Sequence, residues 1–154
     1  MYDLVLVTTG YSRLRTKVEE ISGSHKIIDC EGGRASTLET LGRCMSDGVR
    51  VLLTYRCPYI IPEELYSKAA DGAYNIHPSL LPAYPGLNPW TKIFEDKVSV
   101  SGVTLHRIDR IPDTGEIIRQ IPFHIALEDT LDMARAKADL AAVKLLNYFY
   151  YDTE

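Results

Sequence analysis

Three polar side chains of this sequence have the chemistry of an acyl-transfer site. Asn75 and His77 stand two positions apart in a short run that predicts a strand, so their side chains would share one face. An amide N–H beside an imidazole that can carry a second proton could stabilise a negatively charged oxygen. Asp113 lies in a later polar loop, and a carboxylate close to His77 would orient the imidazole and favour its cationic form. These residue types predict acyl transfer without a protein nucleophile.

Each of these residues also has an ordinary structural interpretation. Asn75 could end a strand, His77 could be a loop histidine, and Asp113 with the next two residues could form a simple turn. Taken singly, each structural role is the more frequent one. The residues around them favour chemistry, because they form a joint pattern.

That pattern consists of four motifs at fixed distances. N-I-H-P-S-L-L-P occupies residues 75–82 and is followed by Gly86, by G-V-T-L-H at 102–106 and by D-T-G-E-I-I at 113–118. Together they resemble the folate-dependent formyltransferases, a family that includes glycinamide ribonucleotide, methionyl-tRNA and sugar-nucleotide formyltransferases. The resemblance is strong from about Val51 to Gln120.

The resemblance implies a reaction and a role for each polar residue. The reaction is transfer of a formyl group from 10-formyltetrahydrofolate to the primary amine of a small, phosphorylated or nucleotide-linked acceptor, with no metal. Asn75 and protonated His77 would stabilise the tetrahedral oxyanion, and Asp113 would orient His77 and assist the proton that leaves the amine. His106 matches a histidine of several members and is expected to play a supporting role.

The resemblance also implies where the two ligands bind. In the family the pterin is held largely by main-chain groups, which places the folate-binding residues in two loops, Tyr55, Arg56, Cys57, Pro58, Tyr59 and Asp109, Arg110, Ile111, Pro112. On the acceptor side, Gly86 would let the backbone approach a ligand closely. Trp90 could stack on the acceptor, although packing in the core is the more frequent role of such a residue.

The turn after the first predicted strand departs from the family pattern. The ribonucleotide enzymes carry S-G-x-G-S-N there, whereas this chain has T-T-G-Y-S-R at 8–13. Gly10 and Ser12 still offer backbone donors at a helix N-terminus, and Arg13 adds charge, so these three residues are predicted to bind the acceptor. The departure argues against glycinamide ribonucleotide. A tRNA acceptor is not expected either, since the additional C-terminal domain of the methionyl-tRNA enzymes is missing from the sequence.

The elements that must position these residues alternate along the chain. The patterns predict strands at 4–8, 26–30, 49–55, 73–77, 101–108 and 116–125, and helices at 12–21, 36–45, 62–70, 89–95 and 129–150. S-T-L-E at 36–39 is interpreted as a capping box, and Asp129 as the cap of the last helix. The prediction is an α/β fold, a Rossmann-like, mostly parallel sheet flanked by helices, with a β-hairpin-like pair and a terminal helix, in one domain of residues 1–154.

Composition excludes several classes of protein. The 154 residues are 45% hydrophobic and 25% charged, which is typical of a soluble globular domain, and the net charge of −4 argues against a general nucleic-acid binder. No run is long enough to cross a membrane, and the start has no signal-peptide pattern, so a cytoplasmic protein is expected. Cys30, Cys44 and Cys57 stand singly and predict neither disulfides nor a zinc site. The aromatic residues 148–151 could pack on the sheet or support a homodimer.

Other functions are compatible with parts of the sequence. D-T-G at 113–115 is also the aspartic-protease tripeptide, but those proteases are nearly all-β. A serine hydrolase that uses Ser79 lacks the G-x-S-x-G elbow. A non-catalytic folate- or nucleotide-binding module would make no demand for Asn, His and Asp together, and a 10-formyltetrahydrofolate hydrolase would release its product without an amine.

Overall fold

The first four strands are parallel and apolar because helices cover both faces of the sheet. The computed structural model describes residues 1–150, in which β1 (Tyr2–Thr8), β2 (His25–Asp29), β3 (Val49–Tyr55) and β4 (Ala73–His77) pair in parallel. In β1, Leu4 and Leu6 face one buried cluster while Val5 and Val7 face the other. This double burial explains the continuous apolar run of the first strand.

The last two strands run antiparallel and complete a mixed sheet. β5 (Val100–Arg107) pairs with β4 and with β6 (Ile117–His124), so the strand order is β2-β1-β3-β4-β5-β6 and β6 forms an edge. The predicted hairpin-like pair is confirmed. Gly115 in the connecting loop is required by packing, because a β-carbon there would overlap the carbonyl oxygen of Arg107.

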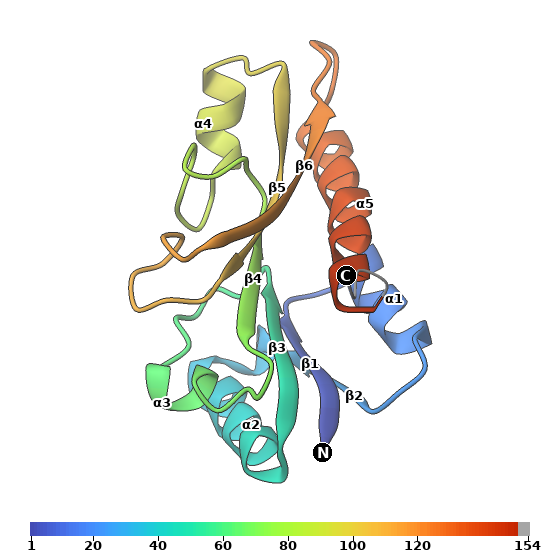
Figure 1. The fold of residues 1–154 in the computed structure, drawn as a ribbon. Helices are drawn as coiled ribbons and strands as arrows, with labels where there is room; N and C mark the ends of the chain where they lie inside the picture. The colour runs from blue at the N-terminus through green and yellow to red at the C-terminus, as the bar shows by residue number, and fades with distance from the viewer. Residues whose placement is uncertain (151–154) are drawn as a thin grey trace.

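Two layers of helices enclose the sheet (Figure 1). On one face lie α1 (Arg13–Glu20) and the long α5 (Leu131–Tyr150), and the other face carries α2 (Arg34–Asp47) with the short α3 (Glu63–Tyr66). A 3₁₀ turn, η1 (Cys30–Gly32), follows β2, and α4 (Trp90–Glu95) precedes β5. The predicted α/β, Rossmann-like fold is therefore confirmed, and the nearly all-β fold of an aspartic protease is excluded.

Two predicted helix starts are wrong. α2 begins two residues before the supposed capping box, after Gly33 with φ +96°, and the Thr37 hydroxyl donates back to the Gly33 carbonyl instead of capping a helix end. α5 begins at Leu131, where Thr130 accepts a hydrogen bond from the N–H of Met133. Asp129 is drawn away from that role, because its carboxylate accepts from Lys137 Nζ and from the N–H of Ala126.

The third predicted helix is much shorter than residues 62–70. α3 ends at Tyr66, and the N–H groups of Ala70 and Asp71 donate to the carbonyls of Val49 and Arg50. These bonds lead the chain directly into β4 and use the donors that a longer helix would need.

The aromatic residues at the end of α5 pack against the protein itself. The rings of Tyr148 and Phe149 lie 6.3 and 5.0 Å from the ring of Tyr74, and the Tyr150 hydroxyl lies 2.8 Å from His25 Nε2. Tyr151 lies outside the described residues. The homodimer stays a prediction. None of the helices within residues 1–150 is long and apolar enough to cross a membrane.

Candidate active site

The predicted catalytic residues meet where β4, β5 and the β5–β6 loop come together. Asn75 and His77 are the third and last residues of β4, and the register of β4 with β5 places His106 opposite Asn75. Asp113 comes from the loop that follows β5 and returns toward β4. The side chains of His77 and Asp113 are only 5% and 12% exposed, so water screens their interaction weakly.

Both ring nitrogens of His77 face oxygen acceptors. Nδ1 lies 3.4 Å from Asp113 Oδ1, and Nε2 lies 2.8 Å from the main-chain carbonyl oxygen of Tyr84. A neutral imidazole has one N–H, whereas the imidazolium has one for each acceptor. The two oxygen acceptors therefore hold the imidazole in one orientation.

The Asp113 carboxylate is itself fixed by the main chain of another loop. Its Oδ2 accepts a 2.7 Å hydrogen bond from the N–H of Gly86, and its Oδ1 also lies 3.8 Å from His106 Nε2. The backbones of Asp113 and Gly86 both have positive φ, +61° and +102°, which aspartate tolerates and glycine adopts freely. Gly86 thus contributes to the site as a donor to the carboxylate.

Asn75 is held by two neighbours. Its Oδ1 accepts a 2.7 Å hydrogen bond from the Thr54 hydroxyl, and its Nδ2 lies 3.0 Å from His106 Nε2. His106 Nδ1 donates to the carbonyl oxygen of Arg107, and burial lowers the pKa of His106, so its Nε2 is a lone-pair acceptor for the amide. An amide has two N–H groups, so Asn75 keeps one to offer to a substrate.

The first predicted folate-binding loop is engaged mainly through its side chains. Tyr55 ends β3 with its ring 1% exposed, and its hydroxyl donates to Asp139. Arg56 also donates to Asp139, at 2.8 Å, and the Tyr59 hydroxyl donates to the Cys30 carbonyl. Burial first, and the charge of Asp139 second, raise the pKa of Tyr55. Tyr55 therefore belongs to the core, and the segment open to a ligand begins at Arg56.

The rest of the predicted folate-binding set lies at the surface. Pro58 is exposed, as are Asp109, Arg110, Ile111 and Pro112. Arg110 forms a two-pronged ion pair with Glu63, at 2.7 and 3.2 Å, which ties the β5–β6 loop to α3 next to the β3–α3 loop. The folate-binding role of residues 56–59 and 109–112 stays a prediction.

The predicted acceptor residues are only partly brought together. Gly10 lines a cavity of about 360 Å³, but Ser12 is fully buried, accepts from the N–H of Arg15 as the cap of α1, and does not line the cavity. Arg13 is exposed and does not line it either. The helix start uses the Ser12 hydroxyl, and Arg13 lies outside the cavity. The prediction for Gly10 and Ser12 concerns their backbone donors, so the acceptor-binding role of these residues stays a prediction.

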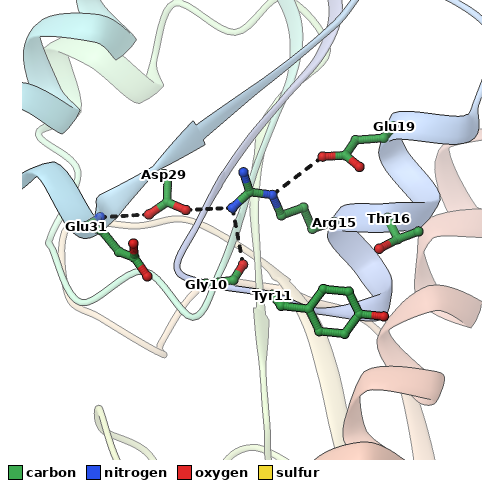
Figure 2. Close-up of a pocket in the computed structure, with 7 residues that line it drawn as sticks. All are labelled: Gly10, Tyr11, Arg15, Thr16, Glu19, Asp29 and Glu31. Atoms are coloured by element: carbon green, nitrogen blue, oxygen red, sulfur yellow. Dashed lines mark hydrogen bonds and ion pairs between the residues drawn. The ribbon is translucent and has the colours of Figure 1, made fainter.

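The cavity has an excess of carboxylates (Figure 2). The residues that line it are Gly10, Tyr11, Arg15, Thr16, Glu19, Asp29 and Glu31. Arg15 is already engaged, 2.6 Å from Asp29 Oδ2, 3.6 Å from Glu19 Oε1 and 3.3 Å from the Gly10 carbonyl. The N–H of Glu31, and then the Arg15 guanidinium, hold the pKa of Asp29 below its usual value.

Three other candidates have structural roles. Trp90 is 7% exposed in the core, so packing rather than stacking on an acceptor is its role. The buried Ser79 hydroxyl donates to the carbonyls of Ala83 and Tyr84, which removes it as a nucleophile. The Sγ atoms of Cys30 and Cys57 lie 3.7 Å apart, and burial raises the pKa of Cys57 to about 12, so that thiol stays protonated. Within residues 1–150 no group of three or more His, Cys, Asp or Glu side chains is arranged to hold a metal.

Sequence reasoning missed several contributors to the site. The Thr54 hydroxyl, the Tyr84 carbonyl and the Gly86 N–H all contact predicted catalytic residues. Main-chain groups leave no signal in residue types. Thr54 could have been noticed only by aligning the third and fourth predicted strands in register.

Comparison with known proteins agrees with this geometry. A sequence model described as "Formyl transferase" matches residues 34–147. Phosphoribosylglycinamide formyltransferase from Bacillus halodurans is 27% identical, with a TM-score of 0.69 over 96% of this chain and 77% of that one. Glycinamide ribonucleotide transformylase 1 from Symbiobacterium toebii is 18% identical, with a TM-score of 0.77 over 97% and 85% of the two chains. A candidate sugar N-formyltransferase from Mycobacterium tuberculosis is 22% identical, with a TM-score of 0.78 over 97% and 66%. The last two are similar in fold alone.

Proposed function

The chain belongs to the formyl transferase family, and on that premise we propose that it moves a formyl group from 10-formyltetrahydrofolate to the primary amine of a small acceptor. The observation that carries this proposal is the meeting of His77, Asp113 and Asn75 at the end of β4. These residues come from two separate segments of the chain: Asp113 faces His77 Nδ1, and Asn75 contacts His106.

The reaction needs only a bond exchange and one proton transfer. The amine nitrogen bonds to the formyl carbon, the bond between that carbon and the donor nitrogen breaks, and a proton passes from the amine to the donor nitrogen. Negative charge develops on the formyl oxygen on the way. The free N–H of Asn75 and the cationic His77 supply positive potential there, in a site where their neighbours have fixed their orientation in advance.

Asp113 has two roles in this proposal. It stabilises the His77 cation, and it is the acceptor available for the amine proton, directly or through water. The Gly86 N–H holds Oδ2, so Oδ1 is the oxygen that faces the two imidazoles.

The donor would be held by main-chain groups of residues 56–59 and 109–112. Residues 109–112 are exposed, and the ion pair of Arg110 with Glu63 links their loop to the start of α3, which follows residues 56–59. The bound donor supplies the formyl carbon, and the protein supplies position and charge.

The acceptor is proposed to be a phosphorylated or nucleotide-linked amine whose phosphate lies outside the cavity of Figure 2. Three carboxylates and one already paired guanidinium line that cavity, so a phosphate placed inside it would be repelled. This observation argues against a phosphate site in the turn after β1 for either an amino-sugar nucleotide or glycinamide ribonucleotide, and the assay below separates the two acceptors. The net charge of −4 argues against a nucleic-acid acceptor.

One assay tests the proposal. The protein is incubated with 10-formyltetrahydrofolate and a panel of amines, amino-sugar nucleotides and glycinamide ribonucleotide among them, and tetrahydrofolate release is followed. Amine-dependent release that disappears in His77→Ala is the expected result. Release without an amine would instead indicate a hydrolase, and donor binding with no release on any amine would indicate a binding module.

A further inference from the structure

The buried hydroxyl of Thr54 contacts the proposed oxyanion donor directly. Thr54 is 4% exposed on β3 and is the register partner of Asn75 on β4. Its Oγ1 donates to Asn75 Oδ1 at 2.7 Å, a good hydrogen bond by distance. Thr54 lies beside the site but outside all four sequence motifs.

The orientation of the Asn75 amide decides whether it can stabilise an anion. An amide presents an oxygen on one side and an NH₂ group on the other, and a flip about its last torsion exchanges them. Only the orientation in the structure leaves an N–H for substrate. With the carbonyl in that place, Asn75 would repel the developing charge instead.

Two contacts secure this orientation. His106 Nε2 is an acceptor because Nδ1 donates to the Arg107 carbonyl, so it attracts the NH₂ side. A single contact lets the amide pivot about it, whereas the second contact, from Thr54 to Oδ1, fixes the plane. Loss of the hydroxyl would also leave a partly buried carbonyl oxygen without a donor, which is unfavourable.

We propose that Thr54 is a positioning residue for formyl transfer, which holds the Asn75 amide so that its second N–H points to the reacting oxygen. This inference rests on the proposed function for its catalytic meaning. Thr54 is not expected to touch either substrate.

The kinetic test compares three variants. Thr54→Val keeps the size of the side chain but removes the hydroxyl, and kcat should fall about tenfold while the KM for the formyl donor stays within about twofold. Thr54→Ser keeps the hydroxyl and should retain most of the wild-type kcat. Thr37→Val is the matched control, because it removes another buried hydroxyl, which donates to the Gly33 carbonyl on α2, and it should leave kcat unchanged.

A second measurement does not depend on turnover. The sequence has only four side-chain amides, Asn75, Asn88, Gln120 and Asn147, so the NH₂ signals of Asn75 can be assigned as the pair missing from Asn75→Asp. The ¹H–¹⁵N NOE of that pair should be high in the wild type and in Thr54→Ser, and clearly reduced in Thr54→Val.

The outcomes separate the two ideas. An unchanged kcat with an unchanged NOE in Thr54→Val would overturn the positioning role. A reduced NOE in Thr54→Val, together with a wild-type protein that transfers no formyl group to any amine, would support the structural contact but remove its part in catalysis, and the proposed function would then fail on its own assay. A loss of kcat that Thr54→Ser does not rescue would also overturn the proposal, since the hydroxyl would not be the cause.

Discussion

The candidate site on β4 and β5 and the cavity after β1, called the crevice below, differ in the contacts that hold their polar groups. At β4–β5 the side chains sit on paired strands, and their partners are other side chains of the site or main-chain groups of neighbouring loops. After β1 the polar groups lie in a turn and on the exposed side of α1, and they neutralise one another, Arg15 with Asp29 and Glu19. Parallel sheets bind ligands beyond the carboxyl ends of their strands, and both regions are placed accordingly.

This difference shows which of the candidate functional groups are positioned by the sheet and which depend on a loop. Asn75, His77 and His106 lie on the paired strands β4 and β5, so the pairing of these strands determines where their side chains lie. The predicted acceptor-binding residues lie instead in the turn after β1 and at the start of α1. A few substitutions in that turn would reverse its local charge. The same fold can therefore keep one reaction and change the molecule that receives the formyl group.

The largest effect is expected from removing the charged pair at β4–β5. His77→Ala or Asp113→Asn should lower kcat by about 100-fold or more, because each removes a group that stabilises developing charge. The measurement is the rate of tetrahydrofolate release at saturating donor and acceptor. His124→Ala, an exposed histidine of β6, is the matched control and should retain wild-type activity. Wild-type rates in either variant would show that the reacting groups lie elsewhere.

A smaller effect is expected where the crevice is joined to α5. Asp139 accepts from the Tyr55 hydroxyl and from Arg56, and Arg56 also reaches the Tyr11 carbonyl at 3.4 Å. Asp139→Ala should lower the free energy of unfolding by about 2 kcal/mol, since it leaves a buried hydroxyl without an acceptor. Urea unfolding measures this.

The control for Asp139 lies on the same helix. Arg135 is exposed on α5, and Arg135→Ala should change stability by less than about 0.5 kcal/mol. If Asp139→Ala raises the KM of the acceptor more than it lowers kcat, the contacts of Asp139 with Tyr55 and Arg56 support the crevice rather than the β4–β5 site. A larger effect on kcat than on KM would show that these contacts also support the β4–β5 site, and the two regions would then not be separate.

The stability of the β4–β5 region should depend on pH through His106. Burial lowers the pKa of His106 below the usual histidine value of about 6.5, so the unfolded chain binds the proton more readily than the folded one. The contribution is present above about pH 6.5 and is lost as the pH falls through the lower, folded pKa. Urea unfolding between pH 7.5 and pH 5 should therefore show a smaller loss of stability in His106→Gln than in the wild type. An equal loss in both proteins would contradict this origin.

The smallest effect is expected at the cavity after β1. Glu31 is exposed and lines it, so Glu31→Gln should lower the KM of an anionic acceptor by about threefold at low salt. The difference should shrink in 0.5 M NaCl, because salt screens exposed charges. Glu128→Gln, an exposed carboxylate before α5, should have no effect. A higher KM in Glu31→Gln would mean that the carboxylate binds the acceptor, for example through hydroxyl or amine groups.

Much of the β4–β5 site could be predicted because its signals are local. The spacing of Asn75 and His77 puts both side chains on one face of a strand, and the period of two needs no tertiary information. Asp113 was a candidate because it is a carboxylate in a polar loop, and the resemblance supported its assignment to this site, since a loop that returns over about 36 residues has no local signature. Thr54 depends on the register of β3 with β4, which residue types alone do not fix.

The acceptor region and the helix ends were harder to predict, for a different reason. Ser12 was correctly placed at the start of a helix, where its hydroxyl accepts from the N–H of Arg15, and its role as a backbone donor to the acceptor stays a prediction. Arg15 pairs with Asp29, a partner 14 residues away whose proximity no local pattern indicates. The start of α2 was misread because Gly33, with a positive φ, begins the helix without a side-chain cap.

Pro122 near the middle of β6 has a consequence for how the molecule behaves among its own copies. β6 forms one border of the sheet, and a strand there is a ready template for backbone pairing with a neighbouring molecule. Proline has no N–H to contribute, so it interrupts the row of donors that an added strand would use. The eight-residue strand β6 can thus form an unpaired edge of the sheet and still disfavour the edge-to-edge pairing that leads to fibrous aggregates.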